Sequence, residues 1–303
     1  MKHFLSILET PTDEVIAVLN RGFELRGKQT DLLKGKTLAI LFEKPSLRTR
    51  VSFEEAMYRL GGRAVVLGQS EVGLGKREAV EDVSRVLTGM VNGMCLRVFD
   101  HENLKKMAAV STVPVINALS DLSHPAQALA DAMTLAQEFT DNDVTSLKGR
   151  TVVFVGDGNN VARSLAVICG KLGMRFRISV PKQYALAPEW VEKVRAKVPG
   201  FDFASSDDPK AFLKDADAVY ADTFVSMGEE SEKGSKLGAF EGFQLNDELL
   251  SHCPDHTIVM HCLPAYRGTE ITDSVMDGPR SRVFPQAHNR LHAQIGLLAE
   301  LLG

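Results

Sequence analysis

The sequence lacks any uninterrupted apolar run near the ~18 residues that mark a transmembrane helix. It also lacks a convincing secretion signal, because one lysine precedes the apolar residues of segment 1–9 and acidic residues follow at Glu9 and Asp13. We therefore expect a cytoplasmic protein, and we interpret Met1–Glu9 as a first amphipathic helix.

Cysteine is sparse, and neither sign of charge is in large excess. The four cysteines are scattered, which predicts no disulfide framework, and Cys95, Cys169 and Cys253 are typical of small buried side chains. The formal net charge is -4 and the charges are interspersed, so we expect neither a nucleic-acid partner nor a membrane surface.

What is present is the composition of a globular protein with real cores. The 303 residues suggest about two domains of ordinary size. Hydrophobic residues make up 44% of the chain and charged residues 24%. We find no repeat, low-complexity segment or long linker.

Short apolar runs alternate with helix-period stretches along nearly the whole chain. The predicted strands are Leu38–Phe42, Ala64–Leu67, Cys95–Val98, Val113–Ile116, Thr151–Val155, Arg177–Val180, Ala218–Tyr220 and Thr257–Met260. The predicted helices include Phe53–Leu60, Ala79–Met90, Ala126–Phe139, Val161–Leu172, Pro188–Val198 and Gln286–Leu302. This alternation predicts an α/β protein of two domains, each a mostly parallel sheet flanked by helices.

Ligands of such sheets collect beyond the carboxyl ends of the strands. The first candidate there is the segment Pro45–Arg50, which follows a predicted strand and opens a helix. Ser46 is a natural N-cap, and the first-turn N–H groups, the hydroxyls and an arginine fork suit a phosphate. Two arginines in a first helical turn oppose the macrodipole, which favours a bound anion.

Two further strand ends carry groups suited to a carbonyl. Arg97 is the penultimate residue of a predicted strand, where its side chain either reaches a carbonyl oxygen or points to solvent. His124 and Gln127 lie three residues apart at the start of a helix that Pro125 opens, so they share a face. The helix dipole tends to lower the pKa of a histidine at that position, so a neutral imidazole could donate a hydrogen bond to a carbonyl. The alternative is a helix cap at the surface without a catalytic role.

The segment Gly156–Asn160 resembles a dinucleotide-binding turn but departs from it. Val161 stands where the third glycine is expected, and no acid ends the next predicted strand. Nucleotide binding is therefore disfavoured. Asn159 and Asn160 can instead offer amide groups to a zwitterionic ligand.

The last two predicted strands are followed by Asp222 and by His261-Cys262-Leu263-Pro264, respectively. Asp222 suits an ammonium group, Ser226 suits a carboxylate, and Cys262 in a sharp turn is a possible base or polar contact. A zinc site is disfavoured because the His and Cys spacing of residues 252–262 fits no standard pattern. Nucleophilic catalysis by Cys262 is disfavoured because no covalent intermediate is required.

Taken together, these motifs resemble the ornithine carbamoyltransferases of the aspartate/ornithine carbamoyltransferase superfamily. The resemblance runs along nearly the whole chain in the expected order. It rests on Phe42–Arg50, on residues 124–127, on Asp222 with Ser226-Met227-Gly228, on residues 261–264, and on Asn289-Arg290.

The resemblance implies a domain for carbamoyl phosphate, made of residues 1–135 and 286–303, and a domain for ornithine, made of residues 136–285. It implies transfer of the carbamoyl group to the side-chain amine of L-ornithine, giving citrulline and phosphate in arginine biosynthesis. It further implies a homotrimer or a multiple of trimers, and no cofactor or metal.

The resemblance also assigns roles to single residues. The phosphate would be held by Ser46, Leu47 through its backbone, Arg48, Thr49 and Arg290. The carbamoyl oxygen would face Arg97, His124 and Thr49, and the carbamoyl nitrogen would face Gln127. The amino-acid end of ornithine would be held by Asn160, Asp222, Ser226 and Met227. Cys262 and Leu263 would bind carbamoyl phosphate beside the reacting amine. The catalytic residues would be Arg97, His124, Thr49 and Cys262.

One position departs from the family pattern. A neighbouring subunit usually contributes Gln or His to the phosphate from the segment that aligns with residues 72–75, and this chain has Gly73 there. Lys76 or Arg77 is the expected replacement. The polar segment Glu229–Lys236 is typical of a mobile lid.

Other functions stay open at this point. A carbamoyltransferase for aspartate, putrescine or N-acylated ornithine is the nearest alternative, although the first would be expected to carry Pro in place of Cys262. A nicotinamide dehydrogenase is suggested by the Gly156 turn and opposed by the missing glycine and acid. A non-catalytic binding module is the third alternative.

Overall fold

A computed structural model describes residues 1–226, 231 and 233–303, and the chain divides into two compact units. The first unit comprises Met1–Met133, Asn142–Val144 and His288–Gly303. The second comprises Thr134–Asp141 and Thr145–Ala287. The chain changes unit inside two helices, α6 (Pro125–Phe139) and α12 (Val283–Leu302), as well as near residue 142.

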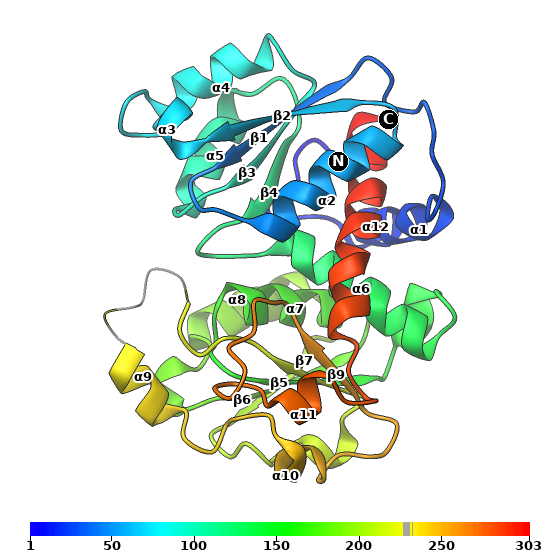
Figure 1. The fold of residues 1–303 in the computed structure, drawn as a ribbon, viewed down its shortest axis with the longest axis vertical. Coiled ribbons are helices and arrows are strands. Elements are labelled where there is room, and N and C mark those ends of the chain that lie inside the picture. Colours follow the sequence, from blue (N-terminus) through cyan, green and yellow to red (C-terminus); the bar gives the residue numbers. More distant parts are fainter. Residues whose placement is uncertain (227–230, 232) are drawn as a thin grey trace. The chain divides into compact units, whose positions relative to one another are not determined.

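The first unit is built on a four-stranded parallel sheet (Figure 1). Its strands are β1 (Thr37–Phe42), β2 (Arg63–Gly68), β3 (Gly93–Arg97) and β4 (Val115–Leu119), in the order β2-β1-β3-β4. β1 and β3 are almost wholly buried because helices cover both faces, which explains their continuous apolar runs.

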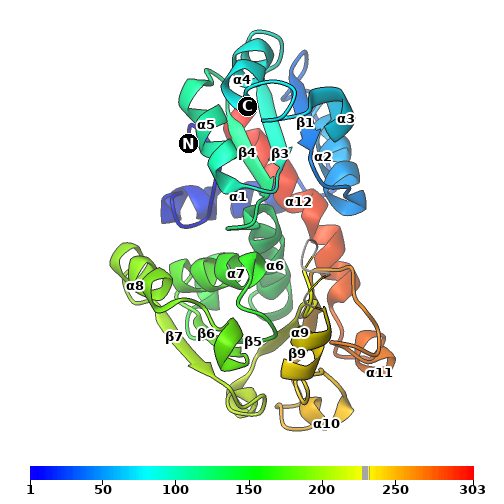
Figure 2. The same cartoon turned by 90° about the vertical axis from the view of Figure 1, so that its left-hand side faces the viewer.

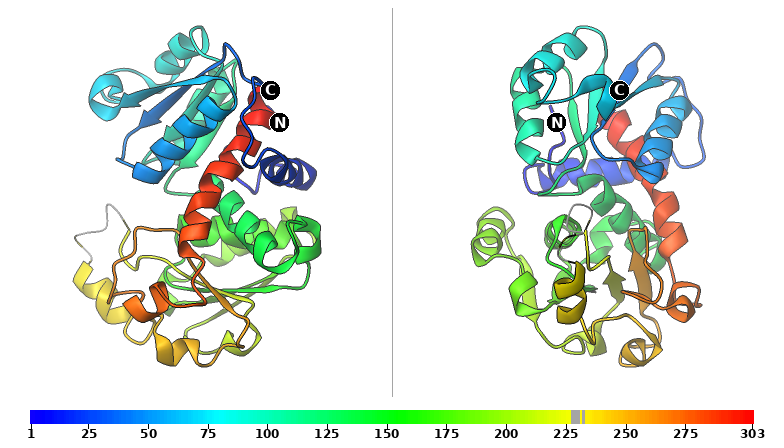
Figure 3. Two further views of the ribbon diagram at one scale, coloured as in Figure 1. Left: turned by 45° about the vertical axis from the view of Figure 1, so that its right-hand side comes forward. Right: turned by 60° about the vertical axis from the view of Figure 1, so that its left-hand side comes forward.

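Right-handed connections between the parallel strands determine which face of the sheet each helix of the first unit covers. The connection from β1 to β2 runs one way across the sheet and places α2 (Leu47–Arg59) on one face, where α12 also lies (Figures 2 and 3). The connections through α4 (Val80–Thr88) and α5 (His101–Val110) run the other way and cover the opposite face. The remaining helices of this unit are α1 (Thr12–Glu24) and the short α3 (Gln69–Val72).

The second unit holds a five-stranded parallel sheet in the order β7-β6-β5-β8-β9. Its strands are β5 (Thr151–Val155), β6 (Arg175–Ser179), β7 (Asp202–Ser206), β8 (Ala218–Ala221) and β9 (Ile258–His261). α7 (Asn160–Lys171) and α8 (Pro188–Lys197) cover one face, and α10 (Asp247–Leu250) and α11 (Asp273–Met276) lie on the other (Figures 1 and 2). The remaining helices are α9 (Lys233–Ala239) and the 3-10 turns Val144–Leu147, Lys182–Tyr184 and Leu213–Asp215.

The two parallel sheets confirm the predicted α/β class. The eight predicted strands are present with ends shifted by up to three residues, and the predicted helices are present. α5 and the edge strand β7 were not predicted, since β7 carries the polar sequence DFASS with no clear alternation. Among the described residues, no helix is both long and apolar enough to cross a bilayer.

The prediction of a helix at Met1–Glu9 is wrong, because the segment extends along the edge of the first sheet. Phe4 is fully buried and exchanges backbone hydrogen bonds with β4, donating to the carbonyl of Val115 and accepting from Asn117, both at 2.8 Å. Pro11 is then the N-cap of the first helix, α1. The apolar residues that suggested an amphipathic helix instead pack against the sheet edge.

Each sheet reverses its strand order once, between β1 and β3 in the first unit and between β5 and β8 in the second. At such a switch point the connections leave in opposite directions, which opens a crevice beyond the carboxyl ends of the two strands. The first switch point is followed by residues 43–50 and 97–99, and the second by residues 156–160 and 222–226. Four of the predicted site segments therefore begin at the two switch points, whereas residues 124–127 and 261–264 follow the edge strands β4 and β9.

A close approach of two helices in the first unit depends on glycine. A Cβ atom added to Gly296 of α12 would lie 2.6 Å from the backbone nitrogen of Gly22 in α1, and would also press on the carbonyl of Val18. A Cβ atom on Gly22 would lie 2.8 Å from the carbonyl of His292. The two helices therefore pack backbone against backbone.

We predict that Gly296→Ala lowers the free energy of unfolding by about 1–3 kcal/mol, since backbone atoms have to move apart. Chemical denaturation followed by circular dichroism measures this change. Gly89→Ala is the matched control, because its added Cβ meets nothing closer than 3.7 Å and its φ of -86° is ordinary. Equal stability of the two variants would contradict the close approach.

Candidate functional site

The start of α2 has the cap that the sequence predicts. Ser46 is extended, with φ -158° and ψ 115°, and its hydroxyl accepts a hydrogen bond from the backbone N–H of Thr49 at 3.3 Å. Thr49 is 1% exposed, whereas Leu47 is 74% exposed. The first turn therefore presents N–H groups and hydroxyls just beyond the carboxyl end of β1.

Arg290 connects three segments of the first unit that are far apart in the sequence. From α12, its guanidinium donates to the side-chain carbonyl of Gln127 at 2.7 Å and to the hydroxyl of Thr49 at 3.3 Å. The Gln127 amide in turn donates to Asp131 Oδ1 at 2.8 Å. Arg290 and Gln127 are 2% and 1% exposed, so these groups have fixed orientations.

His124 precedes α6 and is held neutral by its surroundings. Burial, followed by the positive charges of Arg290, Arg97 and Arg48, keeps the pKa of His124 well below its usual value. Arg97 is the last residue of β3 and is 7% exposed. A neutral imidazole among guanidinium groups can donate a hydrogen bond to a polarised oxygen without adding another charge.

The predicted residues of the first unit thus come together around one cluster. They are Ser46, Leu47, Arg48, Thr49, Arg97, His124, Gln127 and Arg290. Asp131 was missed, although its one-turn spacing from Gln127 is a signal that could have found it. Glu43 was also missed; its carboxylate accepts from the N–H of Phe99 at 2.7 Å and ties the ends of β1 and β3 together.

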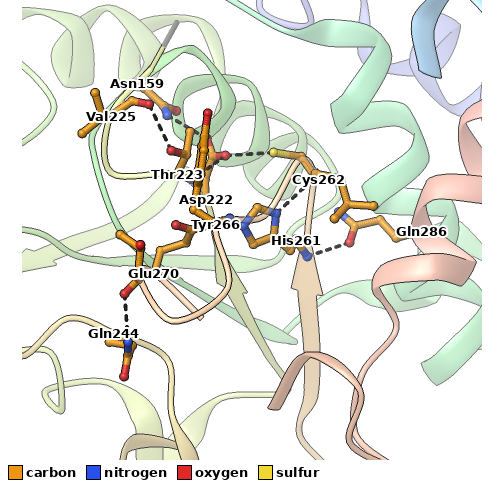
Figure 4. Close-up of polar contacts among 12 residues, drawn as sticks. Asn159, Asp222, Thr223, Val225, Gln244, His261, Cys262, Tyr266, Glu270 and Gln286 are labelled. Carbon is orange, nitrogen blue, oxygen red and sulfur yellow. Dashed lines mark hydrogen bonds and ion pairs between the residues drawn. The ribbon is translucent and has the colours of Figure 1, made fainter. Parts of the chain in front are cut away.

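In the second unit, Asp222 is the centre of the polar contacts (Figure 4). It follows β8, is 4% exposed, and its Oδ2 accepts from the Asn159 side-chain amide at 2.7 Å. Asn159 also caps α7 by accepting from the N–H groups of Val161 and Ala162. Of the two asparagines, Asn159 is the one that contacts Asp222, while the predicted site residue Asn160 is the first residue of α7.

The other carboxylate oxygen of Asp222 faces the end of β9. Asp222 Oδ1 accepts from the backbone N–H of Thr223 at 2.8 Å and from the Cys262 thiol at 3.0 Å (Figure 4). Leu263 follows with a φ of 57° and a cis peptide bond to Pro264. The structure therefore brings Asp222 and the Cys262-Leu263 turn together, as the sequence predicts.

Ser226 is the last described residue of its segment and is partly exposed. The predicted contact Met227 lies outside the described residues. Of the predicted lid, Glu229–Lys236, residues 229, 230 and 232 also lie outside them. The end of that segment belongs to α9, where Lys236 is 2% exposed and pairs with Asp157 Oδ2 at 2.5 Å. This buried ion pair fixes α9 to the turn that follows β5.

That turn does not present the crevice of a dinucleotide site. In such a site the second glycine lets a pyrophosphate approach the backbone. Here a Cβ atom on Gly158 would lie 2.6 Å from the carbonyl of Tyr184 and 2.9 Å from the nitrogen of Leu186. The backbone of residues 184–186 therefore fills the space next to Gly158 that a pyrophosphate would need.

One group of potential metal ligands occurs among the described residues: Asp222, His261 and Cys262, with ligand atoms within 4.8 Å of one another. His261 is already engaged, since its Nδ1 accepts from the N–H of Leu263 at 2.9 Å and its Nε2 faces Glu270 Oε1 at 3.1 Å. Two ligands then remain, fewer than zinc sites generally use. The group is better explained by the hydrogen bonds that it makes.

We predict that His124 of the free protein titrates below the ordinary histidine pKa of about 6.5. The unfolded chain then takes up the proton first as the pH falls, so the stability contributed by neutral His124 is complete above about pH 6.5 and declines below it. NMR titration measures the midpoint, with His124→Gln to assign the signal. A midpoint at or above 6.5 would contradict the proposed environment.

Comparison with known proteins agrees with this arrangement over the whole chain. Residues 2–137 match the family model "Aspartate/ornithine carbamoyltransferase, carbamoyl-P binding domain", and residues 148–301 match "Aspartate/ornithine carbamoyltransferase, Asp/Orn binding domain". An ornithine carbamoyltransferase of Archaeoglobus fulgidus is 46% identical over 308 residues, covering 100% of this chain and 98% of that protein.

Solved structures extend the similarity to the fold. An ornithine carbamoyltransferase from Pyrococcus furiosus superposes with a TM-score of 0.94 at 41% identity, covering 100% of this chain and 97% of that one. An acetylornithine transcarbamylase complexed with acetylcitrulline superposes with a TM-score of 0.89 at 31% identity, with 100% of both chains covered. The chain belongs to the aspartate/ornithine carbamoyltransferase family.

Proposed function

We propose that the chain transfers the carbamoyl group of carbamoyl phosphate to the side-chain amine of L-ornithine, giving L-citrulline and phosphate. One observation carries the proposal: three arginines surround a buried, neutral His124 beyond the carboxyl edge of the first sheet. Such a group is suited to a doubly charged phosphate joined to a carbonyl. The relatives named ornithine carbamoyltransferase support the same activity.

In this proposal the first unit binds carbamoyl phosphate. The capped start of α2 supplies backbone N–H groups to the phosphate, aided by the hydroxyls of Ser46 and Thr49 and by the charge of Arg48. Arg290 adds a second charge, and Gln127, which it orients, faces the carbamoyl nitrogen. Arg97 and His124 face the carbamoyl oxygen.

The second unit, in this proposal, binds ornithine. The Asp222 carboxylate, held by Asn159 and by the Cys262 thiol, attracts an ammonium group and repels a substrate with extra carboxylates. Asn160 and Ser226, together with Met227, complete the contacts to the amino-acid end. This charge preference favours ornithine over aspartate.

The chemistry requires only groups of this chain and the two substrates. The neutral side-chain amine attacks the carbonyl carbon, and negative charge develops on the carbonyl oxygen. Arg97, His124 and Thr49 stabilise that oxyanion, an effect worth several kcal/mol when the donors are held in place beforehand. The carbon–oxygen bond to phosphate then breaks, and the leaving phosphate accepts the amine proton while Arg48 and Arg290 balance its charge.

We predict citrulline formation from carbamoyl phosphate and L-ornithine by the purified chain. Aspartate, putrescine and N-acetylornithine tested in parallel should give far less product, and the acetylated substrate is included because a solved relative carries that name. Colorimetric detection of citrulline, with phosphate release as a second measure, checks this result. If another amine is the better acceptor, that amine becomes the proposed substrate. If no phosphate is released with any amine, the proposed transfer is wrong.

Two variants separate the proposed roles of the units. Arg48→Ala should weaken carbamoyl-phosphate binding by about 10- to 100-fold, because a charge-assisted hydrogen bond is lost. Asp222→Asn should leave that binding unchanged and raise the ornithine requirement instead. Calorimetry with carbamoyl phosphate and steady-state kinetics with ornithine give the two measurements, and equal effects of both variants on both substrates would mean that the assignment is wrong.

The assembly is proposed to be a homotrimer, alone or in multiples. On the exposed face of α2, Leu47, Val51 and Tyr58 form an apolar stripe, with 74%, 54% and 62% of their surface exposed. Covering this stripe with a second copy would remove it from water. Sedimentation equilibrium should give three times the chain mass of 33.1 kDa or a multiple, whereas a single-chain mass would contradict the trimer.

The proposed phosphate contact from a neighbouring subunit is the point at which this chain departs from the family pattern, because position 73 is glycine. Gly73 has a left-handed φ of 59°, and an added Cβ atom would lie 2.7 Å from the Cβ of Arg77. Glycine is therefore required at position 73 by the local backbone. Lys76 or Arg77 is the proposed replacement for the missing side chain. We further propose that the protein acts in the cytoplasm, in arginine biosynthesis.

A further inference from the structure

The turn after β9 has a backbone that needs support from its surroundings. Leu263 adopts φ 57°, a left-handed conformation that non-glycine residues avoid because Cβ approaches the following carbonyl. Pro264 comes next, and the side chain of His261 accepts a hydrogen bond from the backbone N–H of Leu263. The conformation must therefore be maintained by hydrogen bonds and packing.

Three buried acceptors hold the backbone N–H groups of this turn (Figure 4). The N–H of His261 donates to Gln286 Oε1 at 2.8 Å, and the N–H of Leu263 donates to His261 Nδ1 at 2.9 Å. The N–H of Tyr266 donates to Glu270 Oε1 at 2.6 Å. His261, Glu270 and Gln286 are all 0% exposed, so water does not compete for these bonds.

The hydrogen bond from Leu263 fixes the tautomer of His261. Since Nδ1 accepts a proton donor, a neutral imidazole must carry its own hydrogen on Nε2. Nε2 lies 3.1 Å from Glu270 Oε1 and donates to it. Glu270, His261 and Leu263 thus form a chain of hydrogen bonds in which the carboxylate selects the tautomer that holds the left-handed residue.

This chain of hydrogen bonds also determines where Cys262 lies. Cys262 stands between His261 and Leu263, and its thiol donates to Asp222 Oδ1 at 3.0 Å. Asp222 is held from its other side by Asn159 at 2.7 Å. The position of the thiol and of the Leu263 backbone relative to Asp222 therefore depends on the backbone of the turn.

We propose that Glu270 and His261 are positioning residues, which hold Cys262 and Leu263 in the geometry that the transfer to the amine requires. Neither residue touches a substrate in this inference, and both act through the turn. The inference rests on the proposed function for the roles of Cys262 and Leu263. Its structural part, the hydrogen-bond chain that fixes the turn, stands independently of any activity.

Glu270→Leu and Glu270→Gln form the decisive pair of variants. Leucine removes the acceptor for both Nε2 and Tyr266, whereas the glutamine carbonyl keeps an acceptor at Oε1. In Glu270→Leu we expect kcat/KM for ornithine to fall by about 10- to 100-fold, as a displaced contact near the reacting atoms can cause. Glu270→Gln should restore most of that loss, and carbamoyl-phosphate binding should be unchanged in both.

Thiol labelling with Ellman's reagent reports the turn without any turnover. Cys262 is the one partly exposed cysteine, while Cys95, Cys169 and Cys253 are buried, so fast labelling reports Cys262. Loss of the contact with Asp222 should make labelling faster in Glu270→Leu than in the wild type or in Glu270→Gln. Glu248→Leu and Glu248→Gln are matched controls, because Glu248 is 77% exposed and pairs only with Lys210 at the surface of the same unit among its described contacts.

The wild-type protein provides a measurement that does not depend on the folding of any variant. Nitrogen-15 chemical shifts of histidine should show His261 with a protonated Nε2 and an unprotonated Nδ1. The opposite tautomer would overturn the inference, as would unchanged labelling and unchanged kinetics in a folded Glu270→Leu variant. If the wild type forms no citrulline, the proposed function fails, yet the labelling and the tautomer still test the turn.

Discussion

The structure of the first unit depends on how buried positive charge is tolerated. Removing charged groups from water is costly unless they are paired or hydrogen-bonded. Here Arg290 is held by neutral oxygens of Gln127 and Thr49, and His124 gives up its proton instead of adding to the charge of the arginines. The outcome is a cluster of fixed hydrogen-bond donors that carries net positive charge.

Parallel strands explain why such different residues come together. In both units the reversal of strand order opens the carboxyl edge of the sheet, at β1 and β3 in one and at β5 and β8 in the other. The first edge collects hydroxyls and cations, whereas the second collects Asp222, an amide and a thiol. One architecture therefore carries positive charge at one edge and negative charge at the other through the choice of residues after each strand.

In the second unit, neighbouring side chains fix the orientation of Asp222 and Cys262. Asp222 is oriented by Asn159, which also caps α7, so the same side chain stabilises a helix and aims a carboxylate. Cys262 approaches Asp222 from a turn that Glu270 supports at a distance, through His261. Buried residues that do not contact Asp222 thus support the turn that carries Cys262.

The sequence by itself determined the features that depend on near neighbours. These are the alternation of strands and helices, the Ser46 cap, the histidine before Pro125, and the strand-end positions of Asp222 and Cys262, because strand ends and caps are set within a few residues. The helix expected at Met1–Glu9 was wrong because pairing with β4 outweighed local periodicity. Only the tertiary structure decided that Arg290 meets Thr49, 241 residues away, and that Glu270 supports the Leu263 turn, since such contacts follow from packing that no local pattern encodes.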